Sequence, residues 1–188
     1  MNRRALSIEG CFLLEHNVFP DDRGIFREWF KADAIKEIDN SFVVSQANHS
    51  VSRQGVIRGI HFSLAPEGQS KVVTCASGRI VDVLVDLRVG SPTYLKVEYV
   101  ELAEDSGKVV FIASGVGHGF VVQSDSAAVV YLTSSAYAPD FEKAINPTDP
   151  ALTINWPMPE GANPVISSAD LQAPSMADAI DLGILPKF

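Results

Sequence analysis

Short runs of apolar and β-branched residues, separated by turn-forming residues, recur along most of this 188-residue chain. The turn signals include Ser-Gly at 77–78, Gly-Ser-Pro at 90–92, Asp-Ser-Gly at 105–107 and the glycines at 115 and 117. Strands at this spacing, with no long helical pattern between them, are typical of an antiparallel sandwich or barrel. We predict strands over Phe42–Asn48, Val56–Phe62, Lys71–Ser77, Arg79–Arg88, Leu95–Leu102, Lys108–Ile112, Gly119–Ser124 and Ala128–Ser134.

Helical signals are few and lie mainly near the C-terminus. Residues 32–38 are compatible with one short helix. Further on, Ser167 and Ser175 are each followed by an aspartate three residues later, Asp170 and Asp178, which is the spacing of a capping box. Gly183 stands where the end of a helix is expected. We therefore predict two short helices, over 167–173 and after Ser175.

The segment over residues 138–164 is rich in proline, asparagine and aspartate. We interpret it as a long ordered loop, because Ile145, Leu152, Ile154 and Trp156 provide apolar anchors. The length suits one compact unit with a sizeable core, and no repeat or low-complexity tract is evident. The prediction is a single all-β domain over residues 1–188, with a few short helices.

The charge of the chain argues against two classes of partner. With 15 Lys and Arg against 23 Asp and Glu, the net charge is −8, so we predict no nucleic-acid partner and no anionic membrane surface. An anionic ligand must then be met by a few locally placed cations. No apolar run approaches the length of a membrane span, and no signal peptide is predicted. The cysteines Cys11 and Cys75 lie far apart in apolar surroundings, which favours core positions in a reducing, cytoplasmic compartment.

Two aspartates interrupt the otherwise apolar strand predicted over residues 79–88. Apolar residues surround Asp82 and Asp86, which indicates a strand buried on both faces. One interpretation is that both carboxylates point into an interior site. The other is that they pair with the nearby Arg79 and Arg88. The sequence favours neither.

The four histidines of the chain, His16, His49, His61 and His118, lack the spacing of a metal site. A mononuclear centre needs clustered ligands, such as His-x-His on one strand face. The segment RGIHF offers a single histidine, so we predict no metal. Lone histidines in strands are mostly structural, and we place His16 and His49 in that class.

His61 differs because two cationic residues accompany it. Arg58 precedes it by three residues, and Lys71 begins the next predicted strand. If the two strands are antiparallel neighbours, Lys71 lies near His61, where a cation favours the neutral imidazole that a general base needs. Strict alternation puts Arg58 and His61 on opposite faces, unless a bulge at Gly59 re-aims one of them. The alternative is a cluster of cations on a solvated edge.

Tyr131 lies near the end of the apolar run AAVVYL. One interpretation makes it a core residue with a satisfied hydroxyl group. The other makes it a phenolic proton donor that faces a pocket, and the neighbouring residues do not separate the two.

Seven segments follow one another in the order seen in a single family: FPDDRGIFREWF, SQANHSVSRQGVIRGIHF, GQSKVV, IVDVLVDLRVGSPT, GVGHGF, YLTSSAYAPDFE and DPALTINWP. As a set they resemble the dTDP-4-dehydrorhamnose 3,5-epimerases, which act on nucleotide-linked 4-keto-6-deoxy sugars. The resemblance extends from about Phe19 to Asp170, and the ending DLGILPKF is more similar to the branch that makes deoxysugars for secondary metabolites. It implies a cupin-like, antiparallel jelly-roll β-barrel that forms a homodimer and uses neither a metal nor an organic cofactor.

The resemblance also implies roles for particular residues. His61 matches the catalytic base and Asp170 the carboxylate that orients it. Tyr131 matches the general acid on the opposite face of the sugar, and Lys71 the lysine that stabilises charge on the 4-keto oxygen. The implied substrate-binding residues, some of them contributed by the partner subunit, are Arg23, Phe26, Glu28, Gln46, Asn48, Arg58, His118 and Tyr137.

This chain departs from the family pattern at three places. Ala169 stands where relatives usually have Lys or Arg near the phosphates, which affects diphosphate binding. Ala113 replaces a proline, and Asn146-Pro147 occupies a place where an aromatic residue is common. None of these changes removes an implied catalytic residue.

The resemblance predicts an isomerase that epimerises a dTDP-4-keto-6-deoxyhexose at C3, C5 or both. One alternative keeps the site but limits the reaction to C3 or to C5. Two others are a 3,4-ketoisomerase of the same sugars and a non-catalytic cupin that binds a sugar nucleotide.

Overall fold

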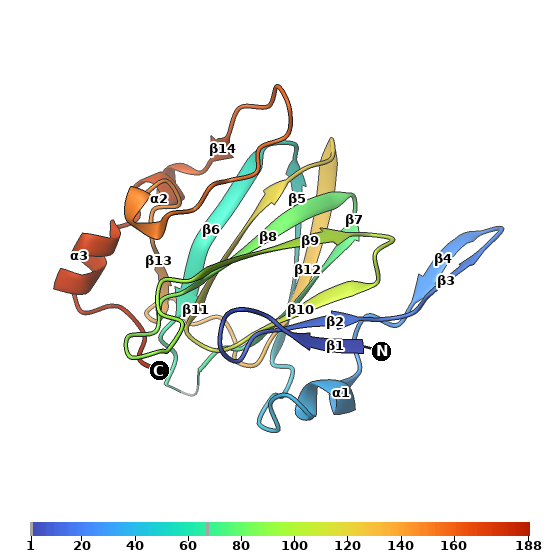
Figure 1. Cartoon of the computed structure of the whole chain (residues 1–188), viewed down its shortest axis with the longest axis horizontal. Coiled ribbons are helices and arrows are strands. Elements are labelled where there is room, and N and C mark those ends of the chain that lie inside the picture. The colour runs from blue at the N-terminus through green and yellow to red at the C-terminus, as the bar shows by residue number, and fades with distance from the viewer. Residues whose placement is uncertain (1, 67) are drawn as a thin grey trace.

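Two β-sheets face each other in the structure, a computed structural model that describes residues 2–66 and 68–188 (Figure 1). The first sheet has the strand order β1-β2-β10-β7-β12-β5, and each of its pairings is antiparallel. Its strands are β1 (Asn2–Ala5), β2 (Phe12–Glu15), β10 (Lys108–Ile112), β7 (Lys71–Ser77), β12 (Ser126–Thr133) and β5 (Gln46–Arg53).

The second sheet has the order β13-β6-β11-β8-β9, and its pairings are also antiparallel. Its strands are β13 (Glu142–Ala144), β6 (Val56–Ser63), β11 (Val116–Val122), β8 (Arg79–Asp86) and β9 (Val97–Ala103). The short strand β14 (Val165–Ile166) adds to β6 in parallel. These two facing sheets confirm the predicted all-β jelly-roll.

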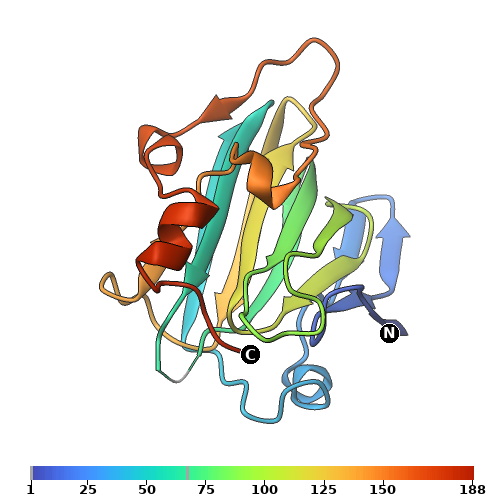
Figure 2. The same cartoon turned by 60° about the vertical axis from the view of Figure 1, so that its left-hand side comes forward.

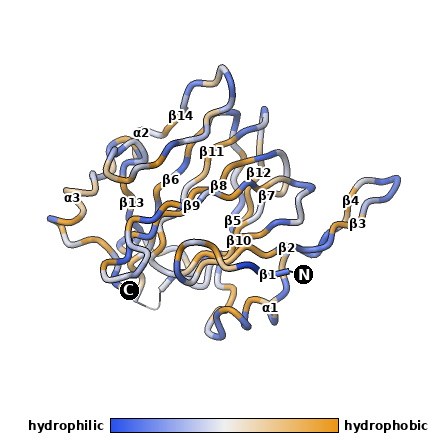
Figure 3. The backbone as a smooth tube through the Cα atoms, viewed as in Figure 1, coloured by the Kyte–Doolittle hydropathy of each residue, from blue (hydrophilic) through white to orange (hydrophobic). Residues whose placement is uncertain are grey.

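The inward faces of the two sheets meet in an apolar core. Val73 on β7 and Val129 on β12 are fully buried there against Ile80 and Leu84 of β8. Because side chains alternate along a strand, the same inward faces continue beyond the core. On β7 the residue two positions before Val73 is Lys71, and there the inward face becomes polar. Figure 3 shows the apolar residues gathered on the sandwich strands and hydrophilic residues at the tips of projecting loops.

Both cysteines are free thiols buried in this core, as predicted. Burial raises the pKa of Cys11 to about 12 and the pKa of Cys75 to about 11. Thiols with such pKa values are almost fully protonated at neutral pH, so these two behave as small apolar residues.

Helices and loops lie over parts of the outer faces of the sheets (Figure 2). Helix α1 (Ala32–Lys36) buries Ile35 against the first sheet. On the second sheet, Ile60 and Phe62 pack under Ile145 and Leu152, which confirms that residues 138–164 are anchored by apolar side chains. The turn η1 (Pro150–Leu152) lies within that segment. This covering segment leads to helices α2 (Ser168–Leu171) and α3 (Met176–Asp181).

The helix ends agree partly with the capping predictions. Ser175 and Asp178 form a reciprocal capping box at α3, and Gly183 follows the C-cap with a left-handed φ of 64°. At α2 the Ser167 side chain accepts a hydrogen bond from the Asp170 backbone N–H. A capping box was wrong there, because the Asp170 carboxylate is hydrogen-bonded to a histidine instead.

Several strand predictions were wrong in their bounds. Strand β5 begins at Gln46 and runs to Arg53, whereas Phe42 packs in the cluster under α1. Strand β11 begins at Val116 and so includes Gly117, one of the two glycines predicted as a turn. There a Cβ atom on Gly119 would lie 2.7 Å from the Arg58 carbonyl oxygen, so glycine allows β6 and β11 to approach closely. Strands β1, β13 and β14 were missed, as were β2 and the hairpin β3 (Val18–Asp21) and β4 (Gly24–Arg27), because all are short.

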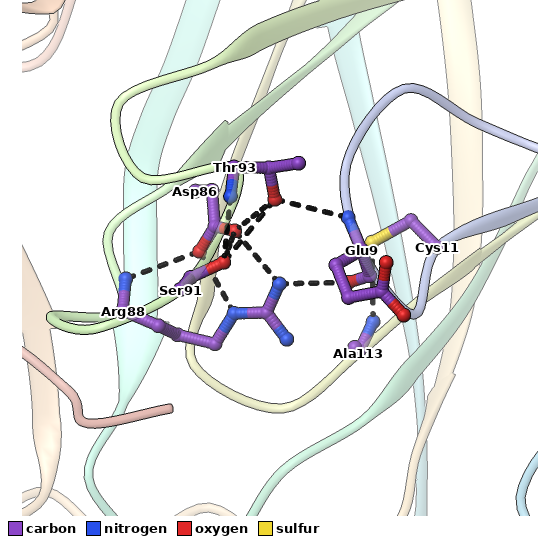
Figure 4. Close-up of polar contacts among 7 residues, drawn as sticks. All are labelled: Glu9, Cys11, Asp86, Arg88, Ser91, Thr93 and Ala113. Carbon is purple, nitrogen blue, oxygen red and sulfur yellow. Dashed lines mark hydrogen bonds and ion pairs between the residues drawn. The ribbon is translucent and has the colours of Figure 1, made fainter.

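Asp86 confirms the ion-pair interpretation of the aspartates in β8. Its carboxylate accepts hydrogen bonds from the Arg88 side chain at 2.8 Å and from the hydroxyl groups of Ser91 and Thr93 at 2.6 Å (Figure 4). Arg88 also donates to the carbonyl oxygen of Glu9. This buried network fastens the loop after β8 to the turn between β1 and β2.

Candidate active site

A cavity of about 550 Å³ opens between the two sheets, beyond the apolar core. Strands β5, β7 and β12 of the first sheet contribute to its wall, and so do β6, β11 and β13 of the second. The predicted site residues that line it are Gln46, Asn48, Arg58, His61, Lys71, His118, Tyr131, Tyr137 and Asp170.

A bulge in β6 aims two functional side chains into the cavity. The pairing with β11 shifts register, because His61 is opposite His118 whereas Arg58 is opposite Phe120. The extra residue reverses the alternation, so Arg58 and His61 both line the cavity, which confirms the predicted bulge. Gly59 lies at this bulge with a φ of 127°, and a Cβ atom there would lie 2.6 Å from the Cα of Gly119.

His61 and Asp170 form a hydrogen-bonded pair at the cavity wall. The Nε2 atom of His61 lies 2.7 Å from Oδ1 of Asp170. Helix α2 fixes the aspartate, whose backbone N–H donates to Ser167 Oγ at 3.0 Å. Burial raises the pKa of Asp170, but hydrogen bonds from His61 and Ser167 outweigh it, so this pKa falls below its usual range. Asp170 is therefore an anion at neutral pH that orients and stabilises a protonated imidazole.

Lys71 is the most deeply placed cation of the cavity. It is only 7% exposed, and no ion pair to it is found among the described residues. Burial lowers its pKa, and the nearby carboxylates of Glu142 and Asp82 partly offset that effect. The predicted pairing of its strand with β6 was wrong, because β7 and β6 belong to different sheets. Lys71 and His61 instead face the cavity from opposite sheets.

Asp82 follows the other interpretation of the β8 aspartates, because it points to an interior site. Its Oδ1 atom lies 2.7 Å from Nε2 of His118, and both residues are buried. Asp82 Oδ2 has no hydrogen-bond partner in the described part of the chain. His118 lines the cavity, so a second histidine–carboxylate pair supports its wall, and Asp82 lies close enough to Lys71 to attract its charge.

Tyr131 lies on the first sheet, next to the strand that carries Lys71. It is partly buried against the apolar core and also lines the cavity, so it faces a pocket as the second interpretation requires, whereas its role as proton donor stays a prediction. Burial raises the pKa of its phenol, the Arg58 guanidinium lowers it, and the net shift is upward. A protonated phenol at neutral pH is suited to donate a proton.

Gln46, Asn48 and Tyr137 form a connected group at the mouth of the cavity. The Gln46 side chain donates to Asn48 Oδ1 at 2.7 Å and accepts from the Tyr137 backbone N–H at 2.8 Å. The Tyr137 side chain itself is 65% exposed, which leaves its ring free to stack on a ligand.

Arg23, Phe26 and Glu28 do not reach this cavity. They lie on or beside the β3–β4 hairpin, which extends away from the sandwich (Figure 1). Phe26 is 64% exposed, and its ring centroid lies 6.3 Å from that of Phe19. Arg23 pairs with Asp21, and Glu28 pairs with Lys31.

Sequence reasoning missed several residues of the cavity wall: Ser50, Gln69, Thr133, Glu142 and Lys143. Glu142 and Gln69 are hydrogen-bonded to each other at 3.3 Å. A signal existed for Ser50, because it continues the alternation of Gln46 and Asn48. Glu142 and Gln69 lie in quoted motifs but carry no local pattern that marks them.

The structure places the departures from the family pattern in different surroundings. Ala169 lines the cavity, and so does the cationic residue Lys143 of β13. Asn146 donates to the Leu171 carbonyl oxygen, and Pro147 accepts from the Trp156 indole. These two residues therefore support the segment that carries α2.

Over residues 2–66 and 68–188, no group of three or more histidine, cysteine, aspartate or glutamate side chains is arranged to hold a metal ion. In the same ranges, no helix has the length and apolar character needed to cross a bilayer.

Comparisons with known proteins agree with the geometry. A family model described as dTDP-4-dehydrorhamnose 3,5-epimerase matches residues 5–178. A dTDP-4-dehydrorhamnose 3,5-epimerase from Streptomyces griseus is 45% identical over 98% of this chain and 92% of its own length. The structure of NovW, a 4-keto-6-deoxy sugar epimerase from Streptomyces spheroides, has a TM-score of 0.94 at 43% identity and covers 100% and 94% of the two chains. ChmJ, a 3'-monoepimerase from Streptomyces bikiniensis in complex with dTDP-quinovose, has a TM-score of 0.89 at 40% identity and covers 97% and 91%.

Proposed function

This chain belongs to the dTDP-4-dehydrorhamnose 3,5-epimerase family, which is a family of isomerases, and we propose that it epimerises a dTDP-4-keto-6-deoxyhexose at C3, C5 or both. One observation carries the proposal. The His61–Asp170 pair and the Tyr131 phenol reach a single cavity from opposite sheets, and the buried Lys71 enters the same cavity from the strand next to that of Tyr131. A proton can therefore leave one face of a bound sugar and return on the other.

The substrate supplies the acidity that the reaction needs. A ketone at C4 acidifies the hydrogens at C3 and C5, and removing either one leaves an enolate with its charge on the C4 oxygen. A fixed cation at that oxygen stabilises charge that develops only as the proton leaves. Lys71 is suited to this role because burial keeps water from screening its charge.

We assign the two proton transfers to His61 and Tyr131. His61 removes the proton, and the Asp170 carboxylate stabilises the imidazolium that forms. Tyr131 donates a proton to the opposite face, which inverts the carbon. His118, held by Asp82, is a further polar group of the same cavity and is available to the C4 oxygen.

The names of the relatives support two outcomes for this site. The Streptomyces griseus relative is named a 3,5-epimerase, whereas ChmJ is described as a 3'-monoepimerase. The four groups assigned above serve either reaction. A mono-epimerase is therefore the second candidate function.

Proton exchange with solvent tests the proposed function. We expect dTDP-4-keto-6-deoxyglucose, incubated with the protein in deuterated water, to gain deuterium at C3 and at C5 well above the rate without protein. NMR resolves the two positions. Deuterium at one carbon only would establish a mono-epimerase, and no enzyme-dependent deuterium at either carbon would contradict the proposal.

We also propose that the protein works as a homodimer in the cytoplasm, with the β3–β4 hairpin completing the site of a second copy. The support is that Arg23, Phe26 and Glu28 lie away from their own cavity on a projecting hairpin. The buried free thiols support a reducing compartment. We expect light scattering after gel filtration to give twice the mass of the chain. A fully active monomer would contradict the sharing of the hairpin.

A further inference from the structure

The inward face of β5 is polar along its whole length, although it faces the inside of a sandwich. Exposure alternates along the strand, and the less exposed positions are Gln46, Asn48, Ser50 and Ser52. The first two were predicted to bind substrate. The two serines continue the same face toward the core, and no role in the proposed reaction has been given to them.

Ser50 carries a hydroxyl group that lacks a partner. Its Oγ atom is buried, forms no hydrogen bond among the described residues and belongs to a residue of the cavity wall. An unpaired buried hydroxyl is costly, whereas the same group bonded to a ligand oxygen is satisfied. Ser50 therefore marks a place where a polar ligand atom is expected.

Ser52 has a partner, which is a cation of the cavity. Its Oγ atom accepts a hydrogen bond from Nε of Arg58 at 3.0 Å, and Ser52 is only 5% exposed. This contact joins the two sheets. It fixes the guanidinium at Nε, and neither terminal nitrogen has a hydrogen bond within the described part of the chain, so both can make a bidentate contact with an anionic group.

Arg58 is suited to receive such a group. It lines the cavity and has no ion pair with any described carboxylate. In a chain with a net charge of −8, a guanidinium without an ion-pair partner, in the same cavity as an unpaired hydroxyl, is a selective place for an anion. The anionic oxygens of a dTDP-sugar are those of its diphosphate.

We propose that Ser50 hydrogen-bonds a phosphate oxygen of the bound nucleotide sugar, and that Ser52 is a positioning residue that holds Arg58 against the same diphosphate. This inference rests on the proposed function for the identity of the ligand. It adds two residues of β5 to the binding machinery, one by direct contact and one through Arg58.

Binding of dTDP, measured by calorimetry with thymidine as the phosphate-free comparison, tests both serines. We expect Ser50→Ala and Ser52→Ala each to weaken dTDP binding about threefold to tenfold, the loss of one hydrogen bond. Thymidine affinity should not change. In turnover, Ser52→Ala should raise KM while kcat stays within about twofold. Ser126→Ala, at an exposed serine of β12, is the matched control and should bind dTDP as the native protein does.

The path through Arg58 is tested by a double-mutant cycle. Lysine has no Nε donor at the guanidinium position, so Ser52→Ala should have no further effect on dTDP binding in an Arg58→Lys background. Ser52→Thr, which keeps the hydroxyl, should restore native affinity, and thermal midpoints identify any variant that fails to fold.

Equal losses from Ser52→Ala in both backgrounds, or equal losses for thymidine and dTDP, would overturn the positioning role. Native dTDP affinity in Ser50→Ala would overturn the direct contact. These outcomes differ from failure of the proposed function, because dTDP binding needs no turnover and solvent exchange is measured separately.

Discussion

Replacing His61 by asparagine is expected to lower turnover by about 10²–10⁴-fold, because the general base of the reaction is lost. Asparagine is close to histidine in size, and the His61 side chain is 45% exposed, so the fold should tolerate the change. Deuterium incorporation at C3 and C5 should fall together if His61 removes both protons. NMR measures the rate of deuterium incorporation at each carbon for the native protein and for the variant. The affinity for dTDP is measured in parallel to show that the site still binds nucleotide.

His49→Asn provides the matched control for this substitution. His49 lies on β5 with its side chain on the outward, exposed face, so its loss should leave turnover unchanged. Asp170→Asn should show an intermediate loss, since the imidazole keeps a hydrogen-bonding neighbour but loses the negative charge that stabilises its protonated form. Turnover of His61→Asn within threefold of the native rate would remove His61 from the mechanism.

The fold class was predictable because its signals are local. Alternating apolar residues and turn sequences mark strands such as Val56–Phe62 and Lys71–Ser77 directly, and the structure has β6 and β7 there. Strand partners are not local. Lys71 was expected beside His61 in one sheet, whereas the closing of the sandwich places the two residues on opposite walls of a cavity.

The candidate site was predictable only in part. Alternation alone separates Arg58 from His61, and the bulge that unites them depends on how closely β6 passes β11. Asp170 is far from His61 in sequence and was linked to it by family resemblance alone. By contrast, Ser50 and Ser52 follow the same alternation as Gln46 and Asn48, so a stricter use of period two would have found them.

Replacing Lys71 by methionine is expected to abolish most of the activity and at the same time to stabilise the fold. Removing one preorganised group that stabilises an oxyanion costs about 10²–10³-fold in kcat. Methionine keeps the length of the side chain without its charge. Burial disfavours the charged form of Lys71 in the folded state. The pKa of Lys71 is therefore lowered, despite the attraction of Glu142 and Asp82.

The pH dependence of stability separates this effect from ordinary repacking. A lysine whose folded pKa is lowered binds fewer protons in the folded than in the unfolded state between its two pKa values, so native stability rises with pH there. The gain from Lys71→Met should therefore be full below the folded pKa and vanish as pH rises past the unfolded value of 10.5. Urea denaturation at several pH values measures it, with Lys96→Met as the exposed control. A gain that is independent of pH would show that the buried charge is not its source, and native turnover in Lys71→Met would show that the enolate is stabilised elsewhere.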